Sequence, residues 1–191
     1  MLYPIGRVTE AEAVLREGLE TLPPGLPPTH TLRGAFSNNL AEVLARQGKL
    51  VEAEGYYREV VAQHEAAGSV RTLDGALVLH NLAECLMDQE RFEQALSLEA
   101  QSLEILEAVA VPGFFGTELV RSGLGYLHAI LQHVDEAEVA LEAAVAGLTR
   151  ALGPDDGRTR QAVQRLAELR EAVRRRDARD AAVGGSGSGG P

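Results

Sequence analysis

The sequence has no tryptophan, few aromatic residues, one cysteine and one lysine among its 191 residues. Aromatic residues make up only 4% of the chain, so its core must rest on leucine, alanine and valine, which suit closely packed helices. The lone Cys85 excludes an internal disulfide and fits a reducing compartment. No apolar run approaches the roughly 20 residues that cross a bilayer, and the first residues do not resemble a secretory signal. We therefore expect a cytoplasmic protein without a membrane-spanning helix.

The charge balance is acidic, with a formal net charge of -10 at pH 7. Broad nucleic-acid binding depends on cations that neutralise phosphates, so this balance argues against a nucleic-acid partner. Apolar residues make up 45% of the chain, which is enough for a folded core and excludes a disordered chain.

A repeat with an interval of 42 residues runs through the chain. Leu40 recurs as Leu82 and again as Leu124. Segments rich in Pro and Gly keep the same interval, and between them apolar residues follow a spacing of three and four, which indicates amphipathic helices. Nothing alternates with period two for long enough to predict a strand. Other positions that keep the interval are Asn39 and Asn81; Ala41, Ala83 and Gly125; Leu50, Phe92 and Val134; and Ala53, Ala95 and Ala137.

The pattern predicts about eight helices in one repeat domain over residues 1–180. A hairpin of two helices cannot bury its own apolar face, so neighbouring hairpins stack and share a core. The segment 181–191 is rich in Gly and Ser and predicts a flexible tail, which is either natural or a remnant of cloning. The predicted elements are a lone helix at 8–21, hairpins at 30–66, 70–109 and 115–152, and a capping helix at 156–177.

These residues resemble the tetratricopeptide repeat (TPR). Its pattern is Leu-Gly or Leu-Ala, an apolar residue three positions on, then Ala and an aromatic residue four positions later. The first copy matches it with Leu40, Ala41, Leu44, Ala53 and Tyr57. The interval is longer than the usual 34 residues, which resembles the kinesin light chain type of the repeat. The resemblance implies an all-α, right-handed superhelical solenoid of antiparallel helix hairpins.

Three positions depart from this pattern. Glu99 stands where the first copy has Tyr57, and Ser102 stands where it has Val60. Either the second hairpin is looser there, or neighbouring leucines take over the packing. In the third copy His128 replaces a leucine, and we expect it to be packed in the core.

The resemblance covers about residues 6–172 and implies recognition of a protein or peptide partner. In repeats of this type, the first helix of each hairpin lines a concave groove. Residues on the face of these helices away from the packing stripe are the expected peptide-binding residues. They are Asn38, Asn39, Glu42, Arg46, His80, Asn81, Glu84, Asp88, Ser122, Tyr126, Gln164 and Arg165.

Asn39 and Asn81 are the most suggestive of these residues. Asn both donates and accepts hydrogen bonds, so it can bind the backbone of an extended peptide without reading its sequence. Asn is also a modest helix former, so two copies at one repeat position need a reason. The alternative is a structural Asn, bonded within the hairpin or to water. The mixed charges around this pair suit a ligand with both polar and basic groups.

No catalytic or metal-binding pattern is present in the sequence. The five histidines form no HExxH motif, and one cysteine cannot build a Cys-type zinc cluster. Cys85 is expected to be a small buried hydrophobe, and His133 a solvated residue near a turn. We therefore predict that the chain is not an enzyme and needs no cofactor. Among the histidines, His80 is the candidate for ligand contact.

Two functional hypotheses follow. The first is a protein-interaction module that binds a peptide segment in its groove, without nucleic-acid or membrane partners. The second is a structural or self-associating fragment of a larger regulatory repeat protein, with no ligand of its own. In the second case a homo-oligomer would form through the end helices.

Overall fold

The computed structural model describes residues 5–27 and 29–184, and within them it has eight helices and no strand. The all-α fold predicted from the repeat is therefore confirmed. The helices are α1 (Ile5–Glu20), α2 (Thr31–Arg46), α3 (Leu50–Ala66), α4 (Leu73–Met87), α5 (Phe92–Val109), α6 (Phe115–Ile130), α7 (Val134–Leu152) and α8 (Gly157–Gly184).

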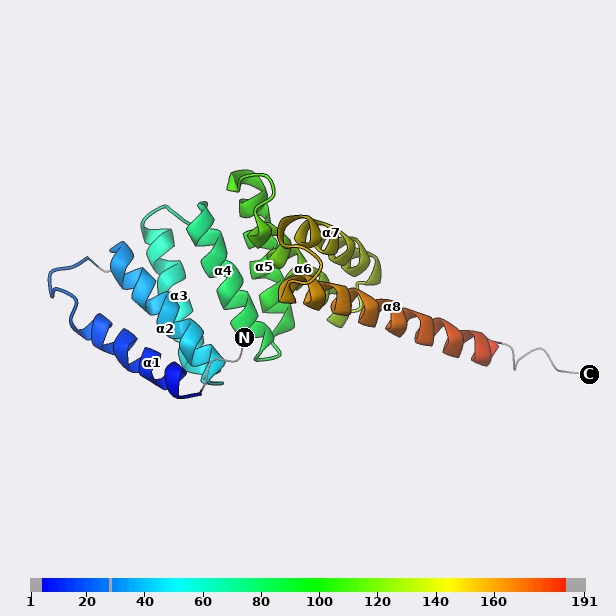
Figure 1. The fold of residues 1–191 in the computed structure, drawn as a ribbon, viewed down its shortest axis with the longest axis horizontal. Coiled ribbons are helices and arrows are strands. Elements are labelled where there is room, and N and C mark those ends of the chain that lie inside the picture. The colour runs from blue at the N-terminus through cyan, green and yellow to red at the C-terminus, as the bar shows by residue number, and fades with distance from the viewer. Residues whose placement is uncertain (1–4, 28, 185–191) are drawn as a thin grey trace, which may run out of the picture. The chain divides into compact units, whose positions relative to one another are not determined.

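The helices form two compact units, Met1–Val111 and Pro112–Pro191, where one domain over 1–180 was predicted. In the first unit, α1 packs against α2, and two hairpins follow, α2 with α3 and α4 with α5 (Figure 1). The hairpins meet through α3 and α4, and α2 also touches α4. The first helices of these two hairpins therefore lie side by side.

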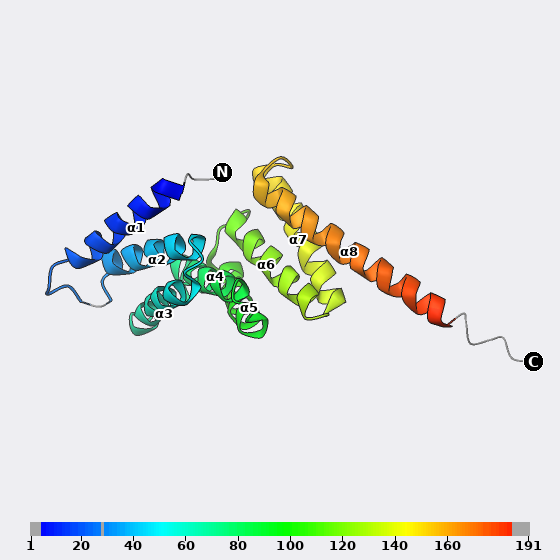
Figure 2. The same cartoon turned by 90° about the horizontal axis from the view of Figure 1, so that it is seen from below.

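In the second unit, α6 and α7 form a hairpin, and α8 packs along α7 and touches α6. The C-terminal part of α8 extends beyond α7 (Figure 2). The capping helix was predicted over 156–177, but α8 continues to Gly184, into the segment predicted as a tail. Alanine, the strongest helix former, is the most frequent residue of this extension. The remainder of that segment, residues 185–191, lies outside the described residues.

The turn inside each hairpin has the same geometry three times. One residue takes a left-handed conformation, at Gly48 (φ 76°), Glu90 (φ 60°) and Gln132 (φ 64°). In each copy the next N–H donates to a carbonyl in the last turn of the first helix, which satisfies an oxygen left open at the helix end. The 42-residue interval is thus a property of the backbone as well as of the sequence. The pairs are Lys49 with Leu44 (3.0 Å), Arg91 with Leu86 (2.9 Å) and His133 with His128 (2.9 Å).

The residues that carry the repeat pattern form the core. Leu40, Ala41, Leu44 and Ala53 are fully buried, and Tyr57 is 3% exposed. The two alanines let α2 and α3 approach closely, and the leucines and the tyrosine fill the space beside them.

Ion pairs join successive layers of the first unit. Lys49 Nζ lies 2.9 Å from a carboxylate oxygen of Glu12 on α1. One layer further on, Arg91 Nη1 donates to both oxygens of Glu54, at 2.7 and 2.8 Å. The hydrogen bond from Lys49 is the largest of the contacts that lower the pKa of Glu12 to about 2. Each partner in the second pair follows its counterpart in the first by 42 residues.

The polar departures of the second hairpin find partners inside it. Glu99 is fully buried, and its two carboxylate oxygens lie 2.9 and 3.0 Å from Nδ1 of His80. Ser102 is also fully buried, and its hydroxyl donates to the carbonyl of Ala76 at 2.7 Å. Pairing of the buried polar groups therefore accommodates these residues, as burial requires.

Candidate functional site

The predicted groove residues of the first unit fall on one face of α2 and α4, which we call the α2/α4 face. Asn38 and Asn81 are half-buried at its centre. The remaining members, apart from His80, are exposed around them: Asn39, Glu42, Arg46, Glu84 and Asp88.

A hydrogen bond crosses this face between the two helices. Asn81 Nδ2 donates to Oδ1 of Asn38 at 3.1 Å. The repeat pairs Asn81 with Asn39 by position, but the residue that reaches Asn81 in space is Asn38. Asn39 is turned by about 100° from it around the helix and stays exposed.

The same bond recurs in the second unit at matching repeat positions. Arg165 Nη1 on α8 donates to Oγ of Ser122 on α6 at 3.2 Å. Each partner follows its counterpart, Asn81 or Asn38, by two intervals of 42 residues. A hydrogen bond between first helices is therefore a structural feature of both units, and it supports the structural alternative for Asn81.

His80 does not stand open to a groove, where it was predicted as the candidate for ligand contact. The residue is 9% exposed, and Nδ1 is held by the buried carboxylate of Glu99. Its Nε2 lies 3.8 Å from Glu84. A buried carboxylate needs a hydrogen-bonding partner, and this need draws the imidazole into the hairpin.

The charge on the α2/α4 face is predominantly negative. Arg46 pairs with Glu42 one turn away, which leaves Glu84 and Asp88 in excess. Burial raises the pKa of Asp88, and the charge of Glu84 raises it further. The same carboxylates act on the buried Tyr57. Desolvation is the largest cause of its raised pKa, and the charges of Glu42 and Glu84 raise the pKa further. A cationic group would relieve this repulsion.

In the second unit the predicted residues form a separate cluster on α6 and α8. The guanidinium of Arg165 lies 4.7 Å from the ring centroid of Tyr126, in addition to its bond with Ser122. Gln164 donates to Glu168 one turn further on, at 2.8 Å. Ser122 is 3% exposed, so its hydroxyl serves this cluster more than the surface.

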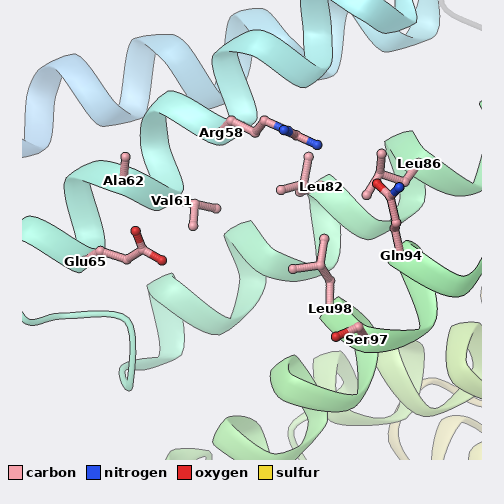
Figure 3. Close-up of a pocket in the computed structure, with 9 residues that line it drawn as sticks. All are labelled: Arg58, Val61, Ala62, Glu65, Leu82, Leu86, Gln94, Ser97 and Leu98. Carbon is pink, nitrogen blue, oxygen red and sulfur yellow. The ribbon is translucent and has the colours of Figure 1, made fainter. Parts of the chain in front are cut away.

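A hollow of about 440 Å³ lies on another side of the first unit, between α3 and α5 and over α4 (Figure 3). Leucine, valine and alanine side chains form its apolar part, and the other lining residues are charged or polar. The sequence pattern did not predict it, because it depends on the spacing between the second helices of two hairpins. Its lining residues are Arg58, Val61, Ala62, Glu65, Leu82, Leu86, Gln94, Ser97 and Leu98.

Cys85 has the surroundings of a packed thiol. It is 2% exposed, and desolvation raises its pKa, which disfavours the thiolate that a nucleophile needs. The residues that the structure describes contain no group of three or more His, Cys, Asp or Glu side chains that could hold a metal ion. Over the same residues, no helix is long and apolar enough to cross a membrane.

Comparison with known proteins agrees with this architecture. Residues 32–108 match the sequence model of a tetratricopeptide repeat. The fold is similar to that of a Podosopora anserina protein described as a kinesin light chain, whose TPR-like repeats are nearly identical to one another. One solved structure of that protein has 22% identity, a TM-score of 0.73, and coverage of 91% of this chain and 82% of that one.

A second solved structure, BtubC (BKLC) from P. vanneervenii, is similar at a TM-score of 0.76 and 22% identity, covering 97% of this chain and 78% of that one. No curated protein sequence matches the chain. The predicted resemblance is confirmed, and a TPR fold supports a protein-interaction or scaffold role. Residues 32–108 match the tetratricopeptide repeat model, and the fold of the chain is similar to that of kinesin light chain-like TPR repeats.

Proposed function

We propose that the chain is a protein-interaction module whose α2/α4 face binds an extended, basic segment of a partner protein. The observation that carries the proposal is the group of exposed carboxylates around the Asn38–Asn81 bond, on two helices that lie side by side. The TPR fold supports the general role, and the charge of this face supports the choice of partner.

The amides supply contacts for a peptide backbone. The bond between them uses one donor of Asn81 and one acceptor of Asn38. It leaves the NH₂ group of Asn38 and the carbonyl oxygen of Asn81, a donor beside an acceptor, which match the C=O and N–H of a peptide unit. The exposed Asn39 adds a second amide on the same helix.

The carboxylates supply the preference for cationic side chains. Glu84 lies in the last turn of α4, and Asp88 follows it as the C-cap residue of that helix. Glu42 lies on α2, where it pairs with Arg46. A partner Lys or Arg placed among them gains charge-assisted hydrogen bonds and relieves the repulsion between the carboxylates.

The test is a selection of random peptides displayed on phage, followed by affinity measurement with labelled synthetic peptides. The wild-type chain is expected to enrich peptides with Lys or Arg. Glu84→Gln combined with Asp88→Asn should weaken their binding about thirtyfold, since each of the two lost charged contacts is worth about 1 kcal/mol at a partly exposed site. Glu59→Gln, an exposed carboxylate on α3, is the matched control and should change little.

Two results would contradict the proposal. One is equal binding of the selected peptides by the wild type and the Glu84/Asp88 double variant. The other is loss of binding in Ser97→Arg, which places a long side chain in the hollow between α3 and α5, while the double variant still binds. The second result would move the interaction to the hollow.

A further inference from the structure

Two histidines meet at the turn between α6 and α7 in a geometry that the proposed interaction does not use. His128, expected in the core, is only half-buried in the last turn of α6, and His133 is exposed just before α7. Their Nδ1 atoms lie 3.2 Å apart, and their ring centroids lie 5.4 Å apart. Each imidazole therefore presents its Nδ1 edge to the other.

Two ring nitrogens at this separation need a cation or a proton between them. A neutral imidazole has one nitrogen with a lone pair, and two lone pairs facing each other repel. Burial lowers the pKa of His128, His133 lowers it further, and the carboxylate of Glu136 acts in the opposite direction. The neutral imidazole is the form that binds metals.

Comparison with the earlier copies of the repeat explains why the two imidazole rings contact each other. At the position of His133 the earlier copies have Lys49 and Arg91, and each of these cations binds a carboxylate. Those carboxylates belong to Glu12 and Glu54, and the residue one interval of 42 further on is Leu96, which carries no charge. At the position of His128 the earlier copies have leucine. The third turn alone combines two imidazoles.

We propose that His128 and His133 bind a divalent transition-metal ion, Zn²⁺ or Cu²⁺, between their Nδ1 atoms. Bonds of about 2.0–2.1 Å at a tetrahedral angle place two ligand nitrogens about 3.3–3.4 Å apart, close to the observed separation. Imidazole suits both metals, and water fills the remaining positions. With two protein ligands the affinity is modest, and the ion ties the end of α6 to the start of α7.

The experiment is calorimetric titration of the whole chain with Zn²⁺, Cu²⁺ and Mg²⁺. His128→Leu and His133→Arg restore the residue types of the other copies, so both variants are expected to keep the fold, which circular dichroism checks. His30→Ser is the matched control, because it removes a histidine and keeps a side chain that can cap α2.

The wild type and His30→Ser are expected to bind one Zn²⁺ or Cu²⁺ per chain, with Cu²⁺ the tighter, and to ignore Mg²⁺, which prefers oxygen ligands. Either site variant should bind the metal at least about tenfold more weakly. Loss of a residue that only hydrogen-bonds to a metal ligand already costs about this much, and these variants remove a ligand itself. In NMR spectra of the wild type, Zn²⁺ should shift the Nδ1 signals of both rings.

The proposal fails if the wild type shows no saturable binding, since the rings then form a hydrogen-bonded imidazole pair only. It also fails if both variants retain the wild-type affinity. Should His128→Leu not fold, His133→Arg decides alone, because His133 is exposed and contributes nothing to the core.

Discussion

At the residue scale, Glu99 shows how a repeat position can exchange a buried aromatic side chain for a carboxyl group. The first copy has Tyr57 there and the third has Leu141, and both are buried. Glu99 occupies the same buried place, where Nδ1 of His80 on the facing helix lies within hydrogen-bonding distance of both of its oxygens. The contact between them explains why both His80 and Glu99 are buried in this hairpin.

Glu99→Ala should therefore destabilise the chain by about 3–5 kcal/mol, because it opens a cavity and leaves a buried imidazole without its partner. The double variant His80→Leu/Glu99→Leu should recover most of this loss, since apolar replacements of a buried pair are often neutral. Urea unfolding measures both values. A single variant that loses less than about 1 kcal/mol would show that the pair contributes little.

At the element scale, the hairpin turns and the helix contacts are set by small local requirements. The left-handed turn residue is glycine in the first hairpin but Glu90 in the second. A side chain in this conformation meets its own backbone, so the second turn is strained where the first is not.

Glu90→Gly should stabilise the chain by about 1 kcal/mol. Glycine avoids the cost of the left-handed conformation, which is roughly 1–2 kcal/mol in other residues, but it loses more conformational entropy on folding, and this loss offsets part of the gain. Gly48→Ala should destabilise it by a similar amount for the converse reason. Thermal unfolding under one buffer condition measures both. Equal melting temperatures for the two variants would contradict this account of the turn.

Helix approach within the third hairpin depends on Gly125. A Cβ at this position would lie 2.8 Å from Cγ of Leu141 and 3.1 Å from its backbone nitrogen. Gly125→Ala should therefore cost about 1–3 kcal/mol through overpacking. Gly55→Ala is the matched control in α3, where an added Cβ meets open space, and it should stabilise by about 0.5–1 kcal/mol. Opposite signs in urea unfolding are the expected result.

The link between α1 and the first hairpin should depend on pH. The pKa of Glu12 is lowered from 4.5 to about 2, mainly by Lys49. A lowered pKa means that the carboxylate stabilises the folded state above pH 4.5 and that this contribution is lost as the pH falls towards 2. Glu12→Gln should remove this pH dependence from the hydrogen exchange of α1. An unchanged exchange profile in the variant would contradict the link.

At the scale of the whole molecule, the chain is two units, and each has its own buried leucines and its own hydrogen bond between first helices. The interaction face proposed for the first unit lies within that unit alone. The proposed interaction therefore requires no second copy of the chain.

Light scattering should therefore give the mass of one chain, and binding of a selected basic peptide should weaken as salt rises, because exposed charges are screened. The alternative hypothesis, self-association through the end helices, predicts a stable dimer. A dimer that persists on dilution and binds no selected peptide would favour the alternative.

The sequence predicted much of the fold and less of the candidate site. The 42-residue interval located the hairpins, and the alanines at 41 and 53 marked the close contacts, because helix periodicity and side-chain size are local properties. The outward face of α2 was also predictable. Which of its two adjacent asparagines would reach Asn81 was not, since neighbours on a helix point about 100° apart.

By itself, the sequence determined the class of fold, the repeat and the apolar stripe of each helix, because these follow from local spacing. The tertiary structure alone decided that Asn38 bonds to Asn81, that His80 turns inward to Glu99, and that His128 meets His133. It also decided the division into two units. These outcomes depend on the rotation and distance between helices, which only the packing of all side chains together can set.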